Sequence, residues 1–518
     1  MPALHEEELL SQDAAAPQRE FLGHPVGLYV LFFTEMWERF SYYGMRAILM
    51  LYMVQYLAWS DGKAGGLYGD YTGLVYITPL FGGFLADRYL GLRRAIVIGA
   101  FTMALGQGFL AFNAYPTTAG GVAAGGGLGV ATLYLGLLLL IAGNGFFKPN
   151  ISTLVGQLYG PEDPRRDAAF TIFYMGINIG AFLAPLICGT LAQHESFGWH
   201  WGFGAACVGM VLGGVIFLWG ARFLGEKGIK PVPGDHHAGG AVLEPISTKE
   251  KARLAVVGVI GAAVALAFAL YTFNETGSIV DAVRAVIWPA TVFIVIGMYL
   301  FMHGRCTKEE MAKVSVIFVL GIFVMIFWAA YEQAGSSLTL FADRSTRLEI
   351  FGFPFVASNF QALPALLVIL FAPIFSAVWT WLSLKGKDPS TPVKMALGLL
   401  FNGAGFLMMV QAALLAADGG RVSPLWLSAC YLLQVMGELC LSPIGLSMVT
   451  RLAPARYGAM LMGVWFLANA FAGKLAGFAG SLYGTLETTT LFAGTAAILL
   501  VFGGLLVVAV PWLKRKMA

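Results

Sequence analysis

Long apolar runs alternate with short polar stretches along almost the whole chain. A helix needs roughly 20 consecutive apolar residues to cross the hydrocarbon core of a membrane. The pattern therefore predicts fourteen transmembrane helices, over residues 25–57, 64–86, 94–113, 128–159, 167–192, 199–224, 251–273, 283–303, 311–340, 353–384, 393–416, 424–451, 457–482 and 489–513.

The composition agrees with an all-α polytopic membrane protein. Of the 518 residues, 58% are hydrophobic and only 12% are charged, against roughly 25% charged residues in soluble domains. The formal net charge of +3 is too small to indicate a nucleic-acid partner. The five cysteines have no CxxC spacing, so we expect neither a disulfide framework nor a metal site.

Lys and Arg residues gather in alternate loops. If the N-terminus is cytoplasmic, 23 of the 32 lie on the cytoplasmic side, five lie outside and four lie within spans. This bias fits the positive-inside rule. We expect a multi-pass membrane protein with both termini in the cytoplasm.

The longest polar interval, 225–250, is rich in Gly and Pro and is typical of a linker. The spans before it and those of the last 213 residues form two sets of similar length, which indicates two six-helix halves related by an axis along the membrane normal. The predicted parts are a cytoplasmic tail (1–22), a first six-helix bundle (23–225), a cytoplasmic linker (226–250), two inserted helices (251–305) and a second six-helix bundle (306–518).

Eight ionisable residues lie well inside the predicted spans. Exposing all of them to lipid would cost roughly 20 kcal/mol or more, at about 2.5 to 3.5 kcal/mol each. We therefore expect them to face a wet interior and to pair with one another. They are Glu35, Glu38, Arg39, Arg46, Lys148, Glu332, Glu438 and Lys474.

Equivalent helices of the two halves carry opposite charges. Arg46 corresponds to Glu332 in this way, and Lys148 corresponds to Glu438. We expect Arg46 and Glu332 to form an outer gate, because both lie nearer the outside than Arg39, Lys148 and Glu438. The alternative is that the pairs are static and only hold helices together; for Lys474, whose partner the sequence does not identify, both interpretations stay open.

Several motifs resemble the proton-dependent oligopeptide transporters (the POT/PTR2 family), a branch of the major facilitator superfamily. EMWERFSYYG at 35–44 is similar to the family's ExxER(F)xYYG motif. Further similar motifs follow in the expected order: GGFLADRYLGLRR (82–94), GFFKPNIS (145–152), FYMGINIGAF (173–182), WAAYEQAGSS (328–337), GELCLSPIGLS (437–447) and GVWFLANAF (463–471).

The resemblance implies a transporter of the bacterial inner membrane, not an enzyme, that imports di- and tripeptides together with protons by alternating access, without a cofactor. The apolar surface that faces lipid gives no reason to require a partner chain, so we expect a monomer. It assigns the peptide carboxylate to Arg39 and Lys148, and the peptide amine to Glu438. It implies three proton-coupling carboxylates and five further residues that line the pocket. The carboxylates are Glu35, Glu38 and Glu332, and the pocket residues are Tyr42, Tyr76, Asn178, Trp328 and Trp465.

Two positions depart from the family pattern. FQALPA at 360–365 has Pro364 where an asparagine is usual. Gly69 occupies the position at which some relatives carry a histidine, and all seven histidines lie in tails, loops or helix ends. We therefore expect carboxylates, and not a histidine relay, to carry the protons.

Other classes of protein fit less well. The chain has no GxxxxGK[ST] motif for an ATP-driven pump, and HESFGWH at 194–200 lacks HExxH spacing for a metalloprotease. A channel needs rings of equivalent residues, which two halves with unlike charges do not supply. A proton-coupled carrier of nitrate or another small anion in the same superfamily stays an alternative, although such a carrier gains nothing from a buried Glu438.

Overall fold

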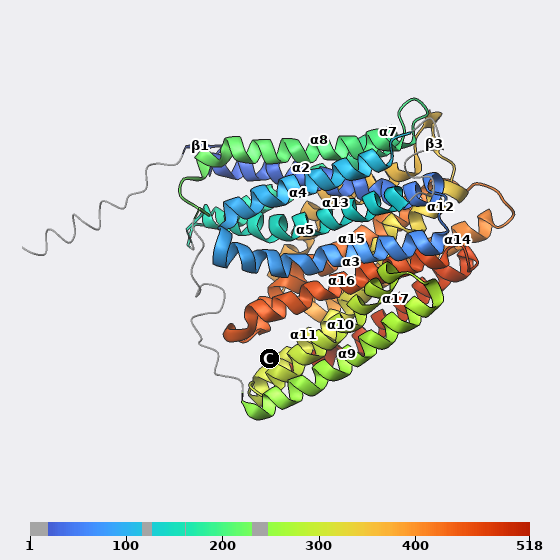
Figure 1. Ribbon diagram of the computed structural model, residues 1–518. Helices are drawn as coiled ribbons and strands as arrows, with labels where there is room; N and C mark the ends of the chain where they lie inside the picture. The colour runs from blue at the N-terminus through green and yellow to red at the C-terminus, as the bar shows by residue number, and fades with distance from the viewer. Residues whose placement is uncertain (1–18, 117–126, 161, 230–246, 518) are drawn as a thin grey trace, which may run out of the picture. The chain divides into compact units, whose positions relative to one another are not determined.

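The computed structural model describes residues 19–116, 127–160, 162–229 and 247–517. Most of the predicted tail (1–22) and linker (226–250) lies outside these residues. Each of the fourteen predicted spans corresponds to a long helix or to a helix with a short continuation, so the all-α prediction is confirmed (Figure 1).

The helices before the linker are long, and three of them end in a π-helical turn. The elements are β1 (Glu20–Phe21), β2 (His24–Pro25), α2 (Val26–Leu51), η1 (Tyr52–Tyr56), α3 (Asp61–Leu85), η2 (Ala86–Leu90), α4 (Leu92–Asn113), α5 (Gly127–Gln157), α6 (Arg166–Ala184), η3 (Pro185–Gly189), α7 (Thr190–Gln193), α8 (Trp199–Gly220) and η4 (Ala221–Leu224).

The remaining helices follow the linker, beginning with the two inserted helices. The elements are α9 (Thr248–Thr276), α10 (Ile279–His303), α11 (Lys308–Tyr331), η5 (Glu332–Gly335), α12 (Ser337–Ser345), β3 (Glu349–Ile350), β4 (Phe353–Pro354), η6 (Ala357–Ala362), α13 (Leu363–Leu384), α14 (Thr391–Ala416), α15 (Leu425–Leu452), η7 (Ala455–Tyr457), α16 (Gly458–Leu482) and α17 (Thr488–Met517). The short strands form two separate antiparallel pairs, β1–β2 and β3–β4.

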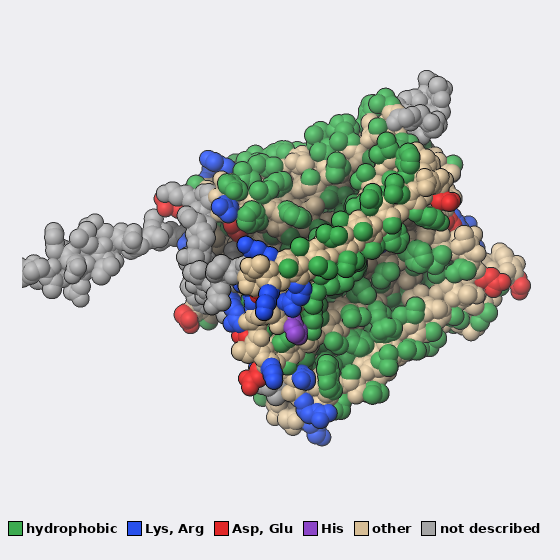
Figure 2. Space-filling view, turned by 60° about the horizontal axis from the view of Figure 1, so that its bottom comes forward, with side chains coloured by type: hydrophobic (Ala, Val, Ile, Leu, Met, Phe, Trp, Pro, Cys, Tyr) green, Lys and Arg blue, Asp and Glu red, His purple; other side chains and the backbone are tan. Residues whose placement is uncertain are grey.

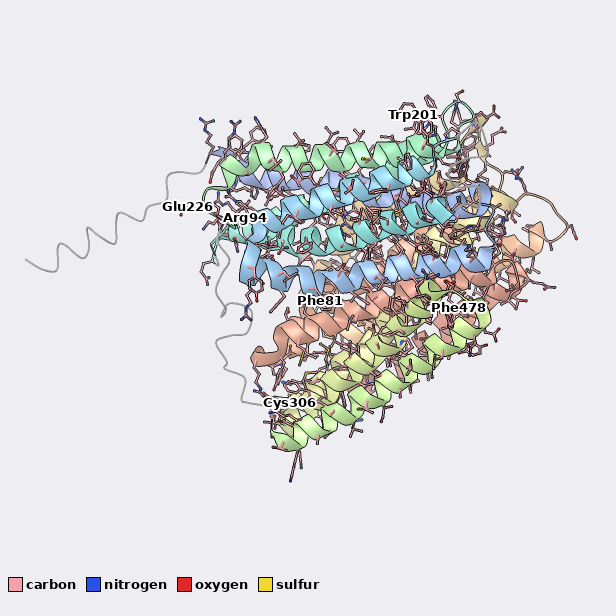
Figure 3. The ribbon with its side chains drawn as sticks, in the orientation of Figure 1. Phe81, Arg94, Trp201, Glu226, Cys306 and Phe478 are labelled. Atoms are coloured by element: carbon pink, nitrogen blue, oxygen red, sulfur yellow. The ribbon has the colours of Figure 1, made fainter. Side chains whose placement is uncertain are left out.

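The helix surfaces suit a lipid environment. Within the residues that the structure describes, eleven helices are long and apolar enough to cross a membrane. Hydrophobic side chains cover the visible helix faces, with most visible Lys and Arg near helix ends (Figure 2). Phe81, Trp201 and Phe478, labelled in Figure 3, are each more than half exposed. Helix α2 is absent from the eleven because it carries four ionisable residues, and these are buried.

Two compact units divide the described chain. The first contains residues up to Ala58, Thr78–Pro233 and Leu348–Ile369, and the second contains Trp59–Ile77, Gly234–Arg347 and Leu370–Ala518. Neither unit is continuous in sequence. The first part of α3 belongs to the second unit, and the segment that leads into α13 belongs to the first.

Glycine allows α6 to approach α2 closely within the first unit. A Cβ atom placed at Gly180 would lie 2.2 Å from the backbone oxygen of Met36 and 3.1 Å from the Cβ of Arg39. One turn earlier, a Cβ at Gly176 would lie 3.0 Å from the ring of Phe32. Small residues at helix crossings permit this approach in membranes, where burial of apolar surface between helices gives little driving force.

We expect Gly180→Ala to destabilise the protein by about 1–3 kcal/mol, because the added methyl group overlaps backbone that cannot move away freely. Gly204 on α8 is a matched control, since a Cβ there meets nothing within 4 Å. Gly204→Ala removes a flexible residue from a helix and is expected to be neutral or slightly stabilising. Thermal unfolding of both variants in detergent checks this; equal stability would contradict the crowding of α2 against α6.

Candidate functional site

One face of α2 carries a buried ionic cluster in the first unit. Arg39 donates two hydrogen bonds to Glu38, one from Nε and one from Nη2 at 2.7 Å. The Nε atom also lies 3.4 Å from Oε1 of Glu35, one helical turn away. The side chains of both glutamates are fully buried. These three charged residues therefore share one face of α2.

Lys148 joins the cluster from α5. Its Nζ donates to Oε1 of Glu35 at 2.8 Å, and its side chain is 34% exposed while that of Glu35 is 0% exposed. Pro149 follows Lys148 within the helix. Proline has no N–H to donate to the carbonyl four residues earlier, which belongs to Gly145, and Gly82 of α3 packs against that carbonyl.

Glu35 is the central residue of this cluster. One of its oxygens contacts both Arg39 and Lys148, and the other, Oε2, is buried with no hydrogen-bond partner among the described residues. The two glutamates and the two cations formally cancel in charge. Because burial makes each charge depend on its partner, a proton on Glu35 or an incoming anion at Lys148 would redistribute the pairs.

Three other predicted site residues of the first unit lie near or beside this cluster. The guanidinium of Arg39 lies 5.1 Å from the ring centroid of Tyr42. Arg46 lies two turns further along α2, is 6% exposed and packs over the ring of Tyr43 at 5.7 Å. Asn178 on α6 is buried, and its amide nitrogen donates one hydrogen bond to the carbonyl of Tyr174 in its own helix.

The second unit holds a separate acidic site. Glu438 on α15 and Glu332 in η5 are both less than a tenth exposed. Tyr331 hydrogen-bonds to Glu438, and the two glutamates are close enough to interact electrostatically. The Oε2 atom of Glu438 is buried and has no hydrogen-bond partner within the described part of the chain. An unsatisfied buried carboxylate oxygen is costly, which makes this a favourable place for a cationic group.

Three aromatic residues predicted to line the pocket belong to the same unit as this acidic site. Trp328 on α11 contacts the ring of Tyr331 at a centroid distance of 5.0 Å. Trp465 on α16 is 5% exposed, and its ring lies against Gly445 of α15, where a Cβ would come within 2.5 Å. Tyr76, on α3, is part-buried. Predicted site residues thus fall into two groups, one in each unit.

Sequence reasoning missed two residues that the structure brings into these polar clusters. Tyr331 gives no charge signal, although it directly precedes Glu332. Asp70 was absent from the eight ionisable residues expected inside spans, yet it is 4% exposed and is the partner of Lys474. The need of Lys474 for an acidic partner within a span was the signal that could have found it.

The two departures from the family pattern have local structural explanations. Pro364 lies in the first turn of α13, where a helix does not require its N–H. Gly69 faces α16, where a Cβ would lie 2.9 Å from the backbone oxygen of Lys474. A histidine side chain has no room at that position. Within the described residues, no group of three or more His, Cys, Asp or Glu side chains could hold a metal ion.

Comparisons with known proteins identify the family. The model described as the POT family matches residues 93–495. The chain is similar to the peptide transporter YePEPT of Yersinia enterocolitica, at 36% identity over 96% of both chains. It is also similar to a di-/tripeptide transporter of Lactococcus lactis subsp. cremoris, at 34% identity over 97% of this chain and 99% of the relative.

A crystal structure of a peptide transporter POT in complex with sulfate has the same fold. It has a TM-score of 0.82 and 38% identity, and the match covers 97% of this chain and 98% of the other. The predicted fold of the major facilitator superfamily is confirmed by this match. The chain therefore belongs to the POT family, whose members are transporters and not enzymes.

Proposed function

We propose that this protein imports di- and tripeptides together with protons by alternating access. The observation that carries the proposal is the shared Glu35 oxygen, which contacts both Arg39 and Lys148. Relatives described as peptide transporters support the substrate class. The charged residues support recognition of a zwitterion, because the first unit holds buried cations and the second holds a buried acid.

A peptide is a zwitterion, so its binding site needs a cationic and an anionic pole. In the proposal, Arg39 and Lys148 bind the peptide carboxylate through charge-assisted hydrogen bonds. Glu438 binds the amine, which supplies a donor to its buried, unpartnered oxygen. Tyr42, Tyr76, Asn178, Trp328 and Trp465 line the pocket. Aromatic side chains with polar edges accommodate many different peptide side chains.

Proton coupling follows from competition for the two cations. Glu35 and Glu38 occupy Arg39 and Lys148 in the structure. Protonation of either glutamate removes its negative charge and releases a cation for the peptide carboxylate. Binding of the proton and binding of the peptide therefore favour each other, and no cofactor is needed.

The same proposal includes a gate and the side of the membrane on which it lies. With the N-terminus in the cytoplasm, Arg46 and Glu332 lie toward the outside of the bacterial inner membrane. Their attraction closes the outer mouth, and protonation of Glu332 weakens it. Such a shift between two states needs a free-energy change of only a few kcal/mol. The protein acts as a monomer in this mechanism.

We expect an inward proton gradient to increase uptake of a labelled dipeptide into proteoliposomes, because protonated carboxylates release the cations that bind the peptide. Uptake is measured with the gradient, without it and with a protonophore. Nitrate uptake is measured in parallel to test a carrier of small anions. Dipeptide uptake that ignores the gradient would remove the coupling, and gradient-driven nitrate uptake without dipeptide uptake would favour the anion carrier.

Lys148→Ala is expected to reduce gradient-driven dipeptide uptake at least tenfold, because a hydrogen bond between charged groups contributes about 1.5–3 kcal/mol. Lys148→Arg is expected to restore little, since guanidinium differs from ammonium in shape and hydration. Lys387→Ala, at an exposed position outside the cluster, is the control. Wild-type uptake by well-folded Lys148→Ala would show that the site is wrongly assigned.

Glu332→Gln is expected to mimic the protonated gate. Peptide exchange between the two sides persists in this variant, while accumulation driven by the proton gradient is lost. Counterflow and gradient-driven uptake are measured separately on the same proteoliposomes. If the pair is static, either single change lowers folded yield, and the double swap Arg46→Glu with Glu332→Arg restores it. Full gradient-driven accumulation by Glu332→Gln would refute the gate.

A further inference from the structure

A second buried ionic cluster lies in the second unit, apart from the residues assigned to substrate and protons. Its centre is Asp70 on α3, whose side chain is 6% exposed. Arg284 of the inserted helix α10 donates to Oδ2 through Nε at 2.6 Å and through Nη2 at 2.5 Å. Trp288, one turn further along α10, donates to Oδ1 at 2.8 Å. Lys474 of α16 donates to the same Oδ1.

The cluster lies on a close contact between α3 and α16, which we call the α3–α16 seam. Glycines of α3 at 65, 69 and 73 face glycines of α16 at 473 and 477 and the backbone of Ser481. A Cβ at Gly477 would lie 2.3 Å from the Cα of Gly69. The spacing of four residues on both helices gives two smooth faces, so the backbones approach directly.

The inserted helix α10 contacts both sides of this seam. The ring of Trp288 lies against Gly73, where a Cβ would come within 2.2 Å of Cη2, and Lys474 lies 5.8 Å from the centroid of the same ring. Arg284 also binds Asp281 of its own helix at 2.9 Å. The two acids and two cations are therefore formally neutral, and both oxygens of Asp70 are fully used.

The other end of the inserted pair is held separately. Glu250 at the start of α9 accepts hydrogen bonds of 2.9 and 3.0 Å from Arg305, which follows α10. The backbone oxygen of Arg305 accepts from Arg456, and Arg456 binds Glu310 of α11 at 2.5 Å. Cys306, labelled in Figure 3, lies at this end. The inserted helices thus have an anchor at each end.

A second contact between the two halves of the sequence contains no charged side chains among the described residues. Segment Leu348–Ile369 packs within the first unit, where Ser358 donates to Gln193 at 2.7 Å and Asn359 donates to Thr190 at 3.3 Å. The α3–α16 seam and this neutral contact each join elements from opposite halves of the sequence. In the proposed topology, both lie toward the first residues of α3 and α13, on the side of the membrane opposite the chain termini. Only the α3–α16 seam, of these two, includes charges and an inserted helix.

We propose that the inserted helices act as a clamp that holds the α3–α16 seam closed, with Arg284 and Trp288 as positioning residues. This inference rests on the alternating-access transport proposed above, in which the two sequence halves separate on one side at a time. Helix α3 belongs to the first half and α16 to the second, so opening on this side must separate them. Separation leaves Asp70 or Lys474 without its partner, which disfavours the open state.

The clamp is tested by distance measurements between spin labels at Lys63 and Glu487, exposed positions beside the seam. The labels are attached to introduced cysteines after the five natural cysteines are replaced. Arg284→Gln removes the charge, and Trp288→Phe keeps the ring over Gly73 while removing the N–H. Each is expected to increase the ratio of long to short distances about tenfold, the effect of losing charge-assisted hydrogen bonds.

Arg305→Gln is the matched control, because it removes an ionic contact of equal type at the opposite end of the same helix. It is expected to leave the distance distribution unchanged. The measurement uses no peptide and no proton gradient, so failed peptide uptake and a failed clamp are separate outcomes. Unchanged distances in folded Arg284→Gln and Trp288→Phe, or an equal shift in Arg305→Gln, would overturn the clamp and leave a static anchor.

Discussion

A carboxylate inside a membrane must share its charge with a cation or lose it, and this constraint shapes both buried clusters. Glu35 contacts Arg39 and Lys148 through one oxygen, while its other oxygen has no partner among the described residues. Asp70 instead receives donors on both oxygens from three side chains. An incompletely satisfied carboxylate is poised to change partners, whereas a saturated one is suited to holding helices together. The same chemistry therefore supports two different roles.

Close approach of helices and buried charge occur together in this protein for a physical reason. Charged side chains can reach one another across a helix crossing only if the backbones are near. Gly180 allows α6 to contact Arg39 of α2. Gly69 allows α3 to pack against the backbone of Lys474 in α16. Glycine within a helix lowers its stability relative to alanine, but it permits this close approach. The charges then add directional contacts that packing between apolar faces does not provide.

The helices and most of the candidate site could be predicted from the sequence, because hydropathy and intramembrane charge are local signals. Glu35, Glu38 and Arg39 share one face of α2 by helical periodicity alone. Pairings across long sequence separations are different: Asp70 and Lys474 are joined by packing of glycine faces, which hydropathy does not reveal. The same packing explains why the first part of α3 belongs to the second unit.

Gly69 lies in the α3–α16 seam and is also the position at which some relatives carry a histidine. A side chain at this position would overlap the backbone of α16, so the close α3–α16 contact and a histidine there exclude each other. The chain has the close contact, and the neighbouring residue Asp70 accepts hydrogen bonds on both of its carboxylate oxygens. In the proposed mechanism the protons are carried by Glu35, Glu38 and Glu332, and Glu35 has a buried oxygen without a partner among the described residues. The close packing of α3 against α16 at Gly69 therefore agrees with the proposal that carboxylates, and not a histidine relay, carry the protons.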